Sequence, residues 1–337
     1  MVPAVPRPAS APGRVTLIGE HTDYNAGRSL GVATRQRTSV ASIPRDDGLV
    51  TVRSGSCGTA STTVAAPSGP AFVQLASTLV SLVGWQGADI HVSSDLPVGA
   101  GLGSSAAYAV ATALSLGVEG DDLAIAMLCQ EAERRAGSDV GLLDQLVVLA
   151  ARSGHVVAID FDGPVISTFP MSAAIGLSVV DTGERRELAA SEYALRRRQC
   201  EEAAAILGPL GRADPDQLAS MGDDLLARRA RHVASECTRV DEARDALAGG
   251  DAKRFGTILD AGHMSLRDDF ETSTPGIERA RDLVLGVDGV LGARLVGGGF
   301  GGCLVVAHDP DLPVQVPGLR CERLHPSAGA SLTPRWR

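Results

Sequence analysis

The sequence predicts an α+β protein made of two domains, on three observations. In the first half, short apolar segments alternate with polar or glycine-rich loops and with helical segments. The second half carries long amphipathic helical segments, and two apolar runs that flank a glycine cluster. Between the halves, residues 160–171 contain Asp, Gly and two prolines, a composition typical of a linker. We therefore predict one domain over residues 1–168 and a second over residues 169–337.

Strand–loop–helix units recur in the first half. Residues 15–18 are apolar and follow a Pro-Gly turn, and residues 88–92 run into a Ser-Ser-Asp-Leu-Pro loop, so both segments are predicted strands. The alanine-rich residues 106–116 and the residues 123–135 are predicted helices. A further strand is expected at residues 155–159. Polar loops at strand ends are the usual places for binding residues.

The second half is predicted to be mainly helical. Amphipathic patterns predict helices over residues 192–207, 215–249 and 276–285. Apolar runs at residues 289–295 and 303–307 are predicted strands on either side of a glycine cluster. Helices and strands are thus mixed in this half.

Composition excludes several classes of protein. At 337 residues with 44% hydrophobic content, the chain has material for two cores. The net charge of -9 comes with acidic and basic residues interspersed, so we expect no nucleic-acid partner. No apolar run approaches the roughly 20 residues that span a bilayer, so no membrane span is expected. The six cysteines have no CxxC spacing and no leader opens the chain, which favours a cytoplasmic protein.

Residues 13–25, GRVTLIGEHTDYN, contain a predicted strand and the polar loop after it, and are rich in hydrogen-bonding groups. Arg14, Glu20, His21 and Asp23 lie close enough in sequence to converge on one ligand. Carboxylates suit a sugar, because a buried acceptor left unpaired penalises an analogue that lacks the matching hydroxyl. Two other interpretations remain at this point, a polar turn with capping roles and a metal site, although one His with two acids lacks the usual set of histidines.

Residues 97–107, PVGAGLGSSAA, lie between a predicted strand and a predicted helix. Gly99, Gly101 and Gly103 allow backbone amides to approach a ligand, and Ser104 and Ser105 stand where the free N–H groups of the helix begin. This pattern indicates an anion site. It is not a Walker A loop, since no Gly-Lys-Ser/Thr follows. A Rossmann fingerprint and a flexible loop before a helix are the alternatives.

Three further features are ambiguous when taken alone. The glycine cluster VGGGFGGC, residues 296–303, favours a structural wide turn. Asp144 stands in an apolar run, either on the wet face of a helix beside Gln145 or buried with a cationic partner, and the spacing favours the wet face. Glu133 is followed by two arginines, which favours a solvated helix end.

The order of the three glycine-containing segments resembles that of the GHMP small-molecule kinases. GRVTLIGEHTDYN, PVGAGLGSSAA and VGGGFGGC are similar to the three signature motifs of that family, and the first resembles the galactokinase form. VGLLDQ, SEYALRRRQCEEA and HMSLRDDFETS extend the likeness over most of the chain. The resemblance implies an N-terminal α/β domain, a C-terminal α+β domain, and an active site in the cleft between them.

The resemblance also implies a role for each matching residue. Asp144 would be the catalytic base at the C1 hydroxyl of galactose, with Arg14 keeping its carboxylate charged. Mg²⁺, bound with ATP, would be held by Ser105 and Glu133. The implied galactose-binding residues are Glu20, His21, Asp23, Gly141 and Tyr193. The implied ATP-binding residues are Gly99, Gly101, Gly103, Ser104, Ser105 and Ala106. No residue is assigned to adenine, and no obligate protein partner is expected.

Two alternative functions remain open. Thr16 and Val140 stand where the family usually has Asn and often has Cys, so a kinase for another sugar or small alcohol is one alternative. A non-catalytic galactose sensor of the same fold is the other. Such sensors lack a Ser-Ala pair in the phosphate loop, whereas Ser105 and Ala106 form that pair in this chain.

Overall fold

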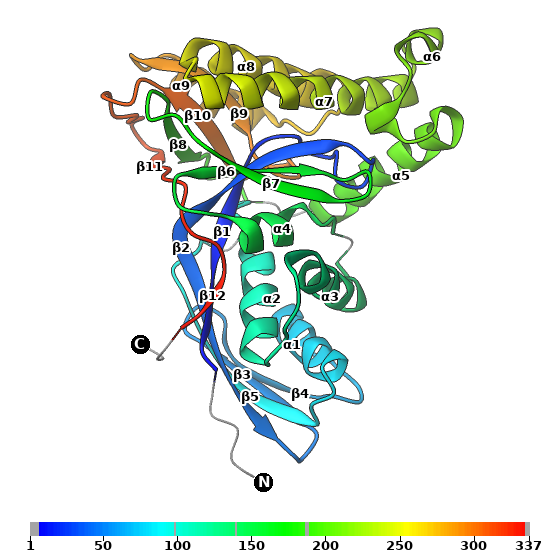
Figure 1. The fold of residues 1–337 in the computed structure, drawn as a ribbon, viewed down its shortest axis with the longest axis vertical. Helices are drawn as coiled ribbons and strands as arrows, with labels where there is room; N and C mark the ends of the chain where they lie inside the picture. Colours follow the sequence, from blue (N-terminus) through cyan, green and yellow to red (C-terminus); the bar gives the residue numbers. More distant parts are fainter. Residues whose placement is uncertain (1–6, 98, 139, 186–188, 334–337) are drawn as a thin grey trace.

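The structure, a computed structural model, describes residues 7–97, 99–138, 140–185 and 189–333. Two β-sheets organise these residues, and the helices pack against them (Figure 1). The larger sheet belongs to the first half of the chain, and the smaller sheet and the long helices belong to the second half. The prediction of a two-domain α+β protein is confirmed.

The first sheet has eight strands that centre on one long strand, β2. The C-terminal part of β2 pairs with β5, and its N-terminal part pairs with β6, so β2 joins the two ends of the sheet. Helices α1 to α4 pack in the same half (Figure 1). The strands are β1 (Ala9–Ile18), β2 (Arg28–Arg45), β3 (Leu49–Ser54), β4 (Gly58–Thr63), β5 (Gly87–Ser94), β6 (His155–Asp160), β7 (Val165–Pro170) and β12 (Ser331–Leu332). The helices are α1 (Ala71–Leu82), α2 (Ser104–Ser115), α3 (Asp122–Arg135) and α4 (Leu143–Ala150).

The second sheet is antiparallel, in the order β11-β8-β10-β9, and helix α8 packs on β9. Its strands are β8 (Gly176–Asp181), β9 (Val290–Leu295), β10 (Cys303–His308) and β11 (Arg320–Arg323). The helices of this half are α5 (Ala189–Leu207), α6 (Pro215–Ser220), α7 (Leu225–Gly249), α8 (Ala252–Asp268) and α9 (Pro275–Leu285), with a 3₁₀ turn at Leu210–Arg212.

The chain passes from the first sheet to the second after Pro170, where β7 ends, and enters β8 at Gly176. The predicted boundary between residues 168 and 169 therefore falls inside β7, which pairs with β6 along its whole length. Near its C-terminus the chain returns to the first half, because β12 pairs with β1.

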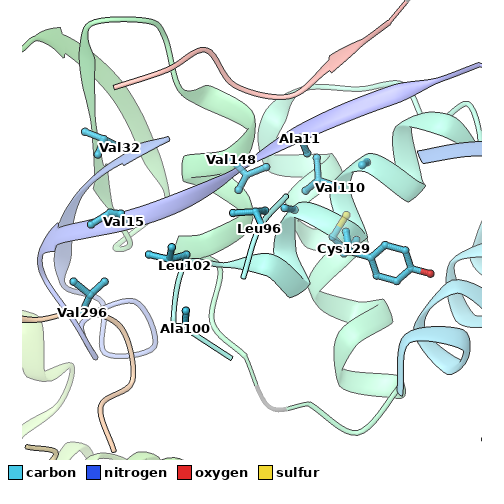
Figure 2. Packing of buried hydrophobic residues seen from close by; sticks show 14 of the residues in the cluster. Ala11, Val15, Val32, Leu96, Ala100, Leu102, Val110, Cys129, Val148 and Val296 are labelled. Carbon is cyan, nitrogen blue, oxygen red and sulfur yellow. The ribbon is translucent and has the colours of Figure 1, made fainter. Parts of the chain in front are cut away.

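Buried hydrophobic residues join the two halves. One core cluster contains Val15 and Leu102 of the first half together with Leu177 and Val296 of the second. Figure 2 shows Val296 close to Val15 and Leu102, near the start of the third motif. Since fully burying a side chain of this size contributes roughly 1.5–3 kcal/mol, shared burial holds the two halves in one arrangement.

Several predicted elements are present with shifted bounds, and two predictions are wrong. The Pro12-Gly13 pair is not a turn before a strand, because β1 runs through it with a register shift against β2. Gly13 is required there, since a Cβ would lie 2.4 Å from Leu96 and 2.7 Å from the Leu102 carbonyl oxygen. The predicted helix over residues 215–249 is two helices, and Asp224 caps the second by accepting from the Ala227 amide.

Candidate active site

A cavity of about 430 Å³ lies where the two halves of the chain meet. Its walls come from the loop after β1, the segment before α4, the start of α5 and the glycines after β9. The lining residues are Arg14, Thr16, Glu20, His21, Asp23, Gly137, Ser138, Val140, Gly141, Leu143, Asp144, Tyr193, Ala194, Gly297, Gly298 and Gly299. The first and third motifs, far apart in sequence, therefore share one cavity.

Arg14 and Asp144 form a two-point ion pair in this cavity. Nε and Nη2 of Arg14 donate to the two carboxylate oxygens of Asp144, at 2.6 and 2.5 Å. The Arg14 side chain is almost fully buried, while a third of the Asp144 side chain remains exposed to the cavity. Asp144 thus lies beside a buried cation and stays accessible to a ligand. The spacing alone favoured the wet face of a helix for Asp144, beside Gln145, over a buried position with a cationic partner. The structure places Asp144 half-buried with Arg14 as its cationic partner, and Gln145 is buried, so the wet-face interpretation is wrong.

Glu20 is the most deeply buried acid of the first motif. Its carboxylate is paired with Arg294, and it also accepts a hydrogen bond from the Gly297 amide at 3.2 Å. Burial raises the pKa of Glu20 to about 7, and the neighbouring Glu236 adds to the rise, although the Arg294 guanidinium opposes it. The first glycine of the third motif therefore supplies a donor to an acid of the first motif.

Asp23 lies against Gly141. A Cβ on Gly141 would fall 1.5 Å from Oδ2 of Asp23, so only glycine leaves room for this carboxylate. Burial raises the pKa of Asp23 to about 6, with the negative charge of Asp144 as the second cause. Two acids thus face one cavity in different environments: Asp144 accepts two hydrogen bonds from Arg14, whereas burial dominates at Asp23 and the charge of Arg197 opposes it only weakly.

His21 and Tyr193 form an aromatic side of the cavity. His21 adopts a positive φ of 64°, which brings its ring within 4.4 Å of Phe270 and 5.4 Å of Tyr193, measured between ring centroids. Nδ1 of His21 shares a hydrogen bond of 2.8 Å with the Tyr24 hydroxyl. The five predicted galactose-binding residues therefore all line the same cavity.

The second motif forms a loop that ends at α2. Gly99, Gly101 and Gly103 all have positive φ, and Gly103 is the N-cap residue without a side-chain cap. The first N–H groups of α2 are therefore not capped by a side chain, as an anion site at a helix N-terminus requires. Nη1 of Arg14 donates to the Gly101 carbonyl oxygen at 2.6 Å, which ties this loop to the Arg14–Asp144 pair.

Glu133 is buried below the start of α2. Its two oxygens accept hydrogen bonds from Ser105 Oγ and from Gln145 Nε2, each at 2.5 Å. Burial raises the pKa of Glu133, although both hydrogen bonds oppose the rise. The interpretation of Glu133 as a solvated helix end is wrong, because only 2% of the residue is exposed. The charge of Arg14 also opposes the rise in this pKa, so a cation held beside Glu133 would stabilise its charged form further.

A second cavity, of about 280 Å³, adjoins the second motif. It lies among β3, α1, β5 and the start of α2, and its walls include Val52, Phe72 and Leu75 as well as Ser104 and Ser105. Ser138 lines both cavities, so the mainly apolar second cavity and the polar first cavity are neighbours.

Sequence reasoning missed three contributions to the site. Gln145 holds Glu133, Arg294 holds Glu20, and the Gly297 amide donates to Glu20. For Gln145 the signal was its place directly after Asp144, where a polar residue inside an apolar run needs a buried partner. For Arg294 the signal was a charge inside a predicted apolar strand.

Two negative findings concern the described ranges alone. Among residues 7–97, 99–138, 140–185 and 189–333, no three His, Cys, Asp or Glu side chains gather as a metal-binding cluster. No helix in the same ranges has the length and apolar character needed to cross a bilayer.

Comparison with known proteins identifies the class first. Residues 71–152 match the GHMP kinases N terminal domain, and residues 243–316 match the GHMP kinases C terminal domain. Residues 4–44 match the galactokinase galactose-binding signature. The chain therefore has the two-domain fold of a GHMP kinase.

Relatives that match most of the chain identify the family within this class. The galactokinase of Homo sapiens is 38% identical over 322 residues, which cover 88% of this chain and 82% of that protein. The galactokinase of Streptomyces coelicolor is also 38% identical, over 328 residues that cover 88% and 83% of the two chains. The structure of Lactococcus lactis galactokinase complexed with galactose superposes with a TM-score of 0.86 at 24% identity, covering 97% of this chain and 95% of that one. The chain belongs to the galactokinase family, a family of ATP-dependent sugar kinases.

Proposed function

We propose that this chain transfers the γ-phosphate of ATP to the C1 hydroxyl of galactose, giving galactose 1-phosphate and ADP. The observation that carries the proposal is the placement of Asp144, paired with Arg14, in a polar cavity beside the glycine loop. In this proposal residues 1–168 supply the phosphate loop and Asp144. Residues 169–337 supply Tyr193 and the glycines that complete the sugar cavity.

The sugar would occupy the polar cavity. Glu20 and Asp23 offer carboxylate oxygens, His21 and Tyr193 offer ring faces and polar atoms, and Gly141 offers backbone beside Asp23. Carboxylates accept sugar hydroxyls in fixed directions, and an epimer would leave a buried acceptor unpaired at a cost of about 1–3 kcal/mol. This cost would select galactose over its epimers.

The nucleotide would occupy the apolar cavity, with its phosphates at the glycine loop. The apolar surface around Phe72 and Leu75 suits a purine ring, while Gly99, Gly101 and Gly103 allow the amides near Ser104, Ser105 and Ala106 to face phosphate oxygens. Because Ser138 lines both cavities, the γ-phosphate would point toward the sugar.

Ser105 and Glu133 carry the kind of ligand atom that Mg²⁺ prefers. Both offer oxygen ligands, and proteins commonly bind this ion through one or two carboxylates together with substrate phosphates. The raised pKa of Glu133 supports the fit, because an adjacent cation would stabilise its charged form. When bound, the ion would neutralise charge on the β and γ oxygens of ATP.

Asp144 would accept the hydrogen bond of the C1 hydroxyl and orient its oxygen toward the γ-phosphorus. The new P–O bond forms at this oxygen, the bond to the β–γ bridging oxygen breaks with its electron pair leaving on ADP, and the hydroxyl proton passes to Asp144. Arg14 stabilises the charged form of Asp144 before transfer. Since the transition state is loose, positioning of the hydroxyl contributes much of the rate enhancement.

We also place the reaction in the cytoplasm. No disulfide joins cysteines within the described ranges, which fits a reducing compartment.

The experiment that tests the function is ADP release with ATP and Mg²⁺ over a panel of galactose, glucose, N-acetylgalactosamine, arabinose, galacturonate, mevalonate and homoserine. Selective turnover of galactose, with the phosphate located on C1 by ³¹P–¹H NMR, is the expected result. Turnover of another panel member in place of galactose would overturn the sugar assignment. No turnover on any member, with galactose still bound in calorimetry, would establish a sensor instead.

A further inference from the structure

A buried ionic network lies directly behind the sugar cavity. Arg294, on β9, is fully buried, and its two terminal nitrogens reach Glu20 and Oε1 of Glu236, the latter at 2.8 Å. Glu236, on α7, also accepts from Nε of Arg239 at 2.8 Å. The network therefore contains two guanidinium groups and two carboxylates, so the charges balance, and only Glu20 among them lines the cavity.

This network crosses from one half of the chain to the other. Gly19 and Glu20 follow β1 of the first sheet, whereas Arg294 and Glu236 belong to the second half. Oε1 of Glu236 accepts from the Gly19 amide at 2.8 Å, so the second half holds the backbone just before Glu20. Gly19 has a φ of 99°, and a Cβ there would lie 2.5 Å from the Arg28 carbonyl oxygen, so the loop is confined on its other side as well.

The space around Arg294 also points to a defined position for its guanidinium. Gly262 of α8 faces it, and a Cβ on Gly262 would lie 2.6 Å from Nη1 of Arg294. A glycine inside a helix destabilises it by roughly 0.5–1 kcal/mol relative to alanine. Gly262 therefore weakens α8 locally, and the space that it leaves for the Arg294 guanidinium offsets this loss.

We propose that Arg294 is a positioning residue for the sugar, which fixes the side chain of Glu20 through a direct ion pair and is itself held by Glu236. The inference rests on the proposed function, because it takes Glu20 as a sugar ligand. Arg294 occupies one side of the Glu20 carboxylate and the Gly297 amide donates to its other oxygen. Glu20 also lines the cavity, so the lone pairs that these two donors leave free are the ones that a sugar hydroxyl would use. Without Arg294, the buried carboxylate would lose its counter-charge and take up a proton or turn away.

A matched control distinguishes positioning from a structural role. Arg281, on α9, is another buried arginine that holds the same strand, donating to the Ala293 carbonyl oxygen at 2.8 Å and to Asp260 at 2.5 Å. Its bonds do not involve Glu20. Both Arg294→Met and Arg281→Met remove a buried cation near β9, so both are expected to lower Tm, but only the first removes the partner of Glu20.

The first experiment measures KM for galactose, KM for ATP and kcat in both variants. We expect Arg294→Met to raise the galactose KM at least tenfold with the ATP KM within twofold of wild type, and Arg294→Lys to recover part of the loss. Arg281→Met should leave the galactose KM within twofold. A galactose KM unchanged in Arg294→Met, or raised equally in the two methionine variants, would overturn the proposal.

A double-mutant cycle tests whether Arg294 acts through Glu20. In a Glu20→Gln background, Arg294→Met should change the galactose KM by less than twofold, because the group that it positions is already altered. Fully multiplicative effects of the two substitutions would overturn the proposal. If Arg294→Met does not fold, Gly262→Ala and Glu236→Gln test the proposal in its place, because each displaces the Arg294 side chain without removing it. Each should raise the galactose KM at least threefold, and unchanged values in both would overturn the proposal.

Failure of the proposed function can be distinguished from failure of the Arg294 proposal. Wild-type protein that phosphorylates another sugar in place of galactose would overturn the substrate assignment, whereas the same cycle, run with the KM for that sugar, still reports whether Arg294 acts through Glu20.

Discussion

Arg14 holds both carboxylate oxygens of Asp144 through Nε and Nη2, and donates to the Gly101 carbonyl oxygen through Nη1. One guanidinium therefore links the acid in the sugar cavity to the glycine loop before α2. Because three N–H groups of one rigid, planar fork serve these partners at once, the single ammonium nitrogen of Lys could not replace Arg14 without losing at least one of them. The arrangement couples the position of the acceptor hydroxyl to the position of the phosphates.

Asp144→Asn should abolish most turnover while leaving the fold and ATP affinity intact. The amide cannot take the hydroxyl proton and loses the charge that pairs with Arg14, so we expect kcat to fall by roughly 10²–10⁴-fold. ATP affinity is measured by calorimetry. Asp160→Asn is the control, because Asp160 does not line the cavity. Its carboxylate accepts hydrogen bonds of 2.7 and 2.8 Å from Arg212, another arginine. Turnover near the wild-type value in Asp144→Asn would refute the role of Asp144.

Gly141→Ala should weaken galactose binding selectively. The added Cβ would overlap Oδ2 of Asp23, so the carboxylate has to turn out of its position. We expect the galactose KM to rise at least tenfold with little change in the ATP KM. Gly249→Ala is the control, since a Cβ there meets nothing within 4 Å. A galactose KM equal to that of the control variant would place Asp23 outside the sugar site.

The kcat/KM for galactose should fall as the pH drops below about 7, first as Glu20 takes up a proton and then, near pH 6, as Asp23 does. Burial raises the pKa of Asp23 to about 6, so this acid takes up a proton in the free enzyme at a pH where an ordinary Asp stays charged. Since kcat/KM reports groups in the free enzyme, the acidic limb should be less steep below pH 6 in Asp23→Asn, where only Glu20 remains to titrate, at a lower overall value. Measuring kcat/KM from pH 5 to 8, with Tm recorded at each pH, tests this. An unchanged limb in Asp23→Asn assigns it to another group.

Asp23→Asn should also stabilise the sugar-free protein near neutral pH. The pKa of Asp23 is raised in the folded state, so between pH 4 and 6 the folded protein binds more protons than the unfolded chain, and this group's contribution to stability falls as the pH rises through that window. Asn removes this cost. Because the side chain borders an open cavity, we expect a gain of roughly 1–2 kcal/mol at pH 7.5, shrinking between pH 6 and 4. Urea unfolding at several pH values measures it, and a loss of stability at pH 7.5 would contradict the prediction.

Glu133→Gln should weaken the binding of Mg²⁺ and leave the binding of galactose unchanged. Removing the negative charge removes a ligand suited to the ion, so we expect the Mg²⁺ concentration for half-maximal rate to rise at least tenfold. Glu131→Gln is the control on the same helix, because Glu131 is half-exposed and pairs with Arg135. If the two variants give the same Mg²⁺ titration, Glu133 is not a ligand of the ion.

The sequence predicted helices better than it predicted the first sheet. Helices α2, α3 and α9 were predicted within two residues at each end, because their apolar periodicity and caps are local features. Strand β2 was missed, because its residues 35–39 are polar and break the alternation of a half-buried strand. Its length becomes favourable only when β1, β5 and β6 all pair with it.

The sequence alone determined the three motifs, their order and the residue types that they bring to a sugar and a phosphate, since these are properties of short segments. Tertiary structure alone decided which acids are buried and which charges meet. Glu133 and Gln145 look like surface residues in sequence, yet they hydrogen-bond in the interior. Arg294 lies 274 positions from Glu20, and nothing local to either residue specifies their contact. Burial and charge pairing depend on how the two halves pack, and that packing is set by the whole core and not by any one motif.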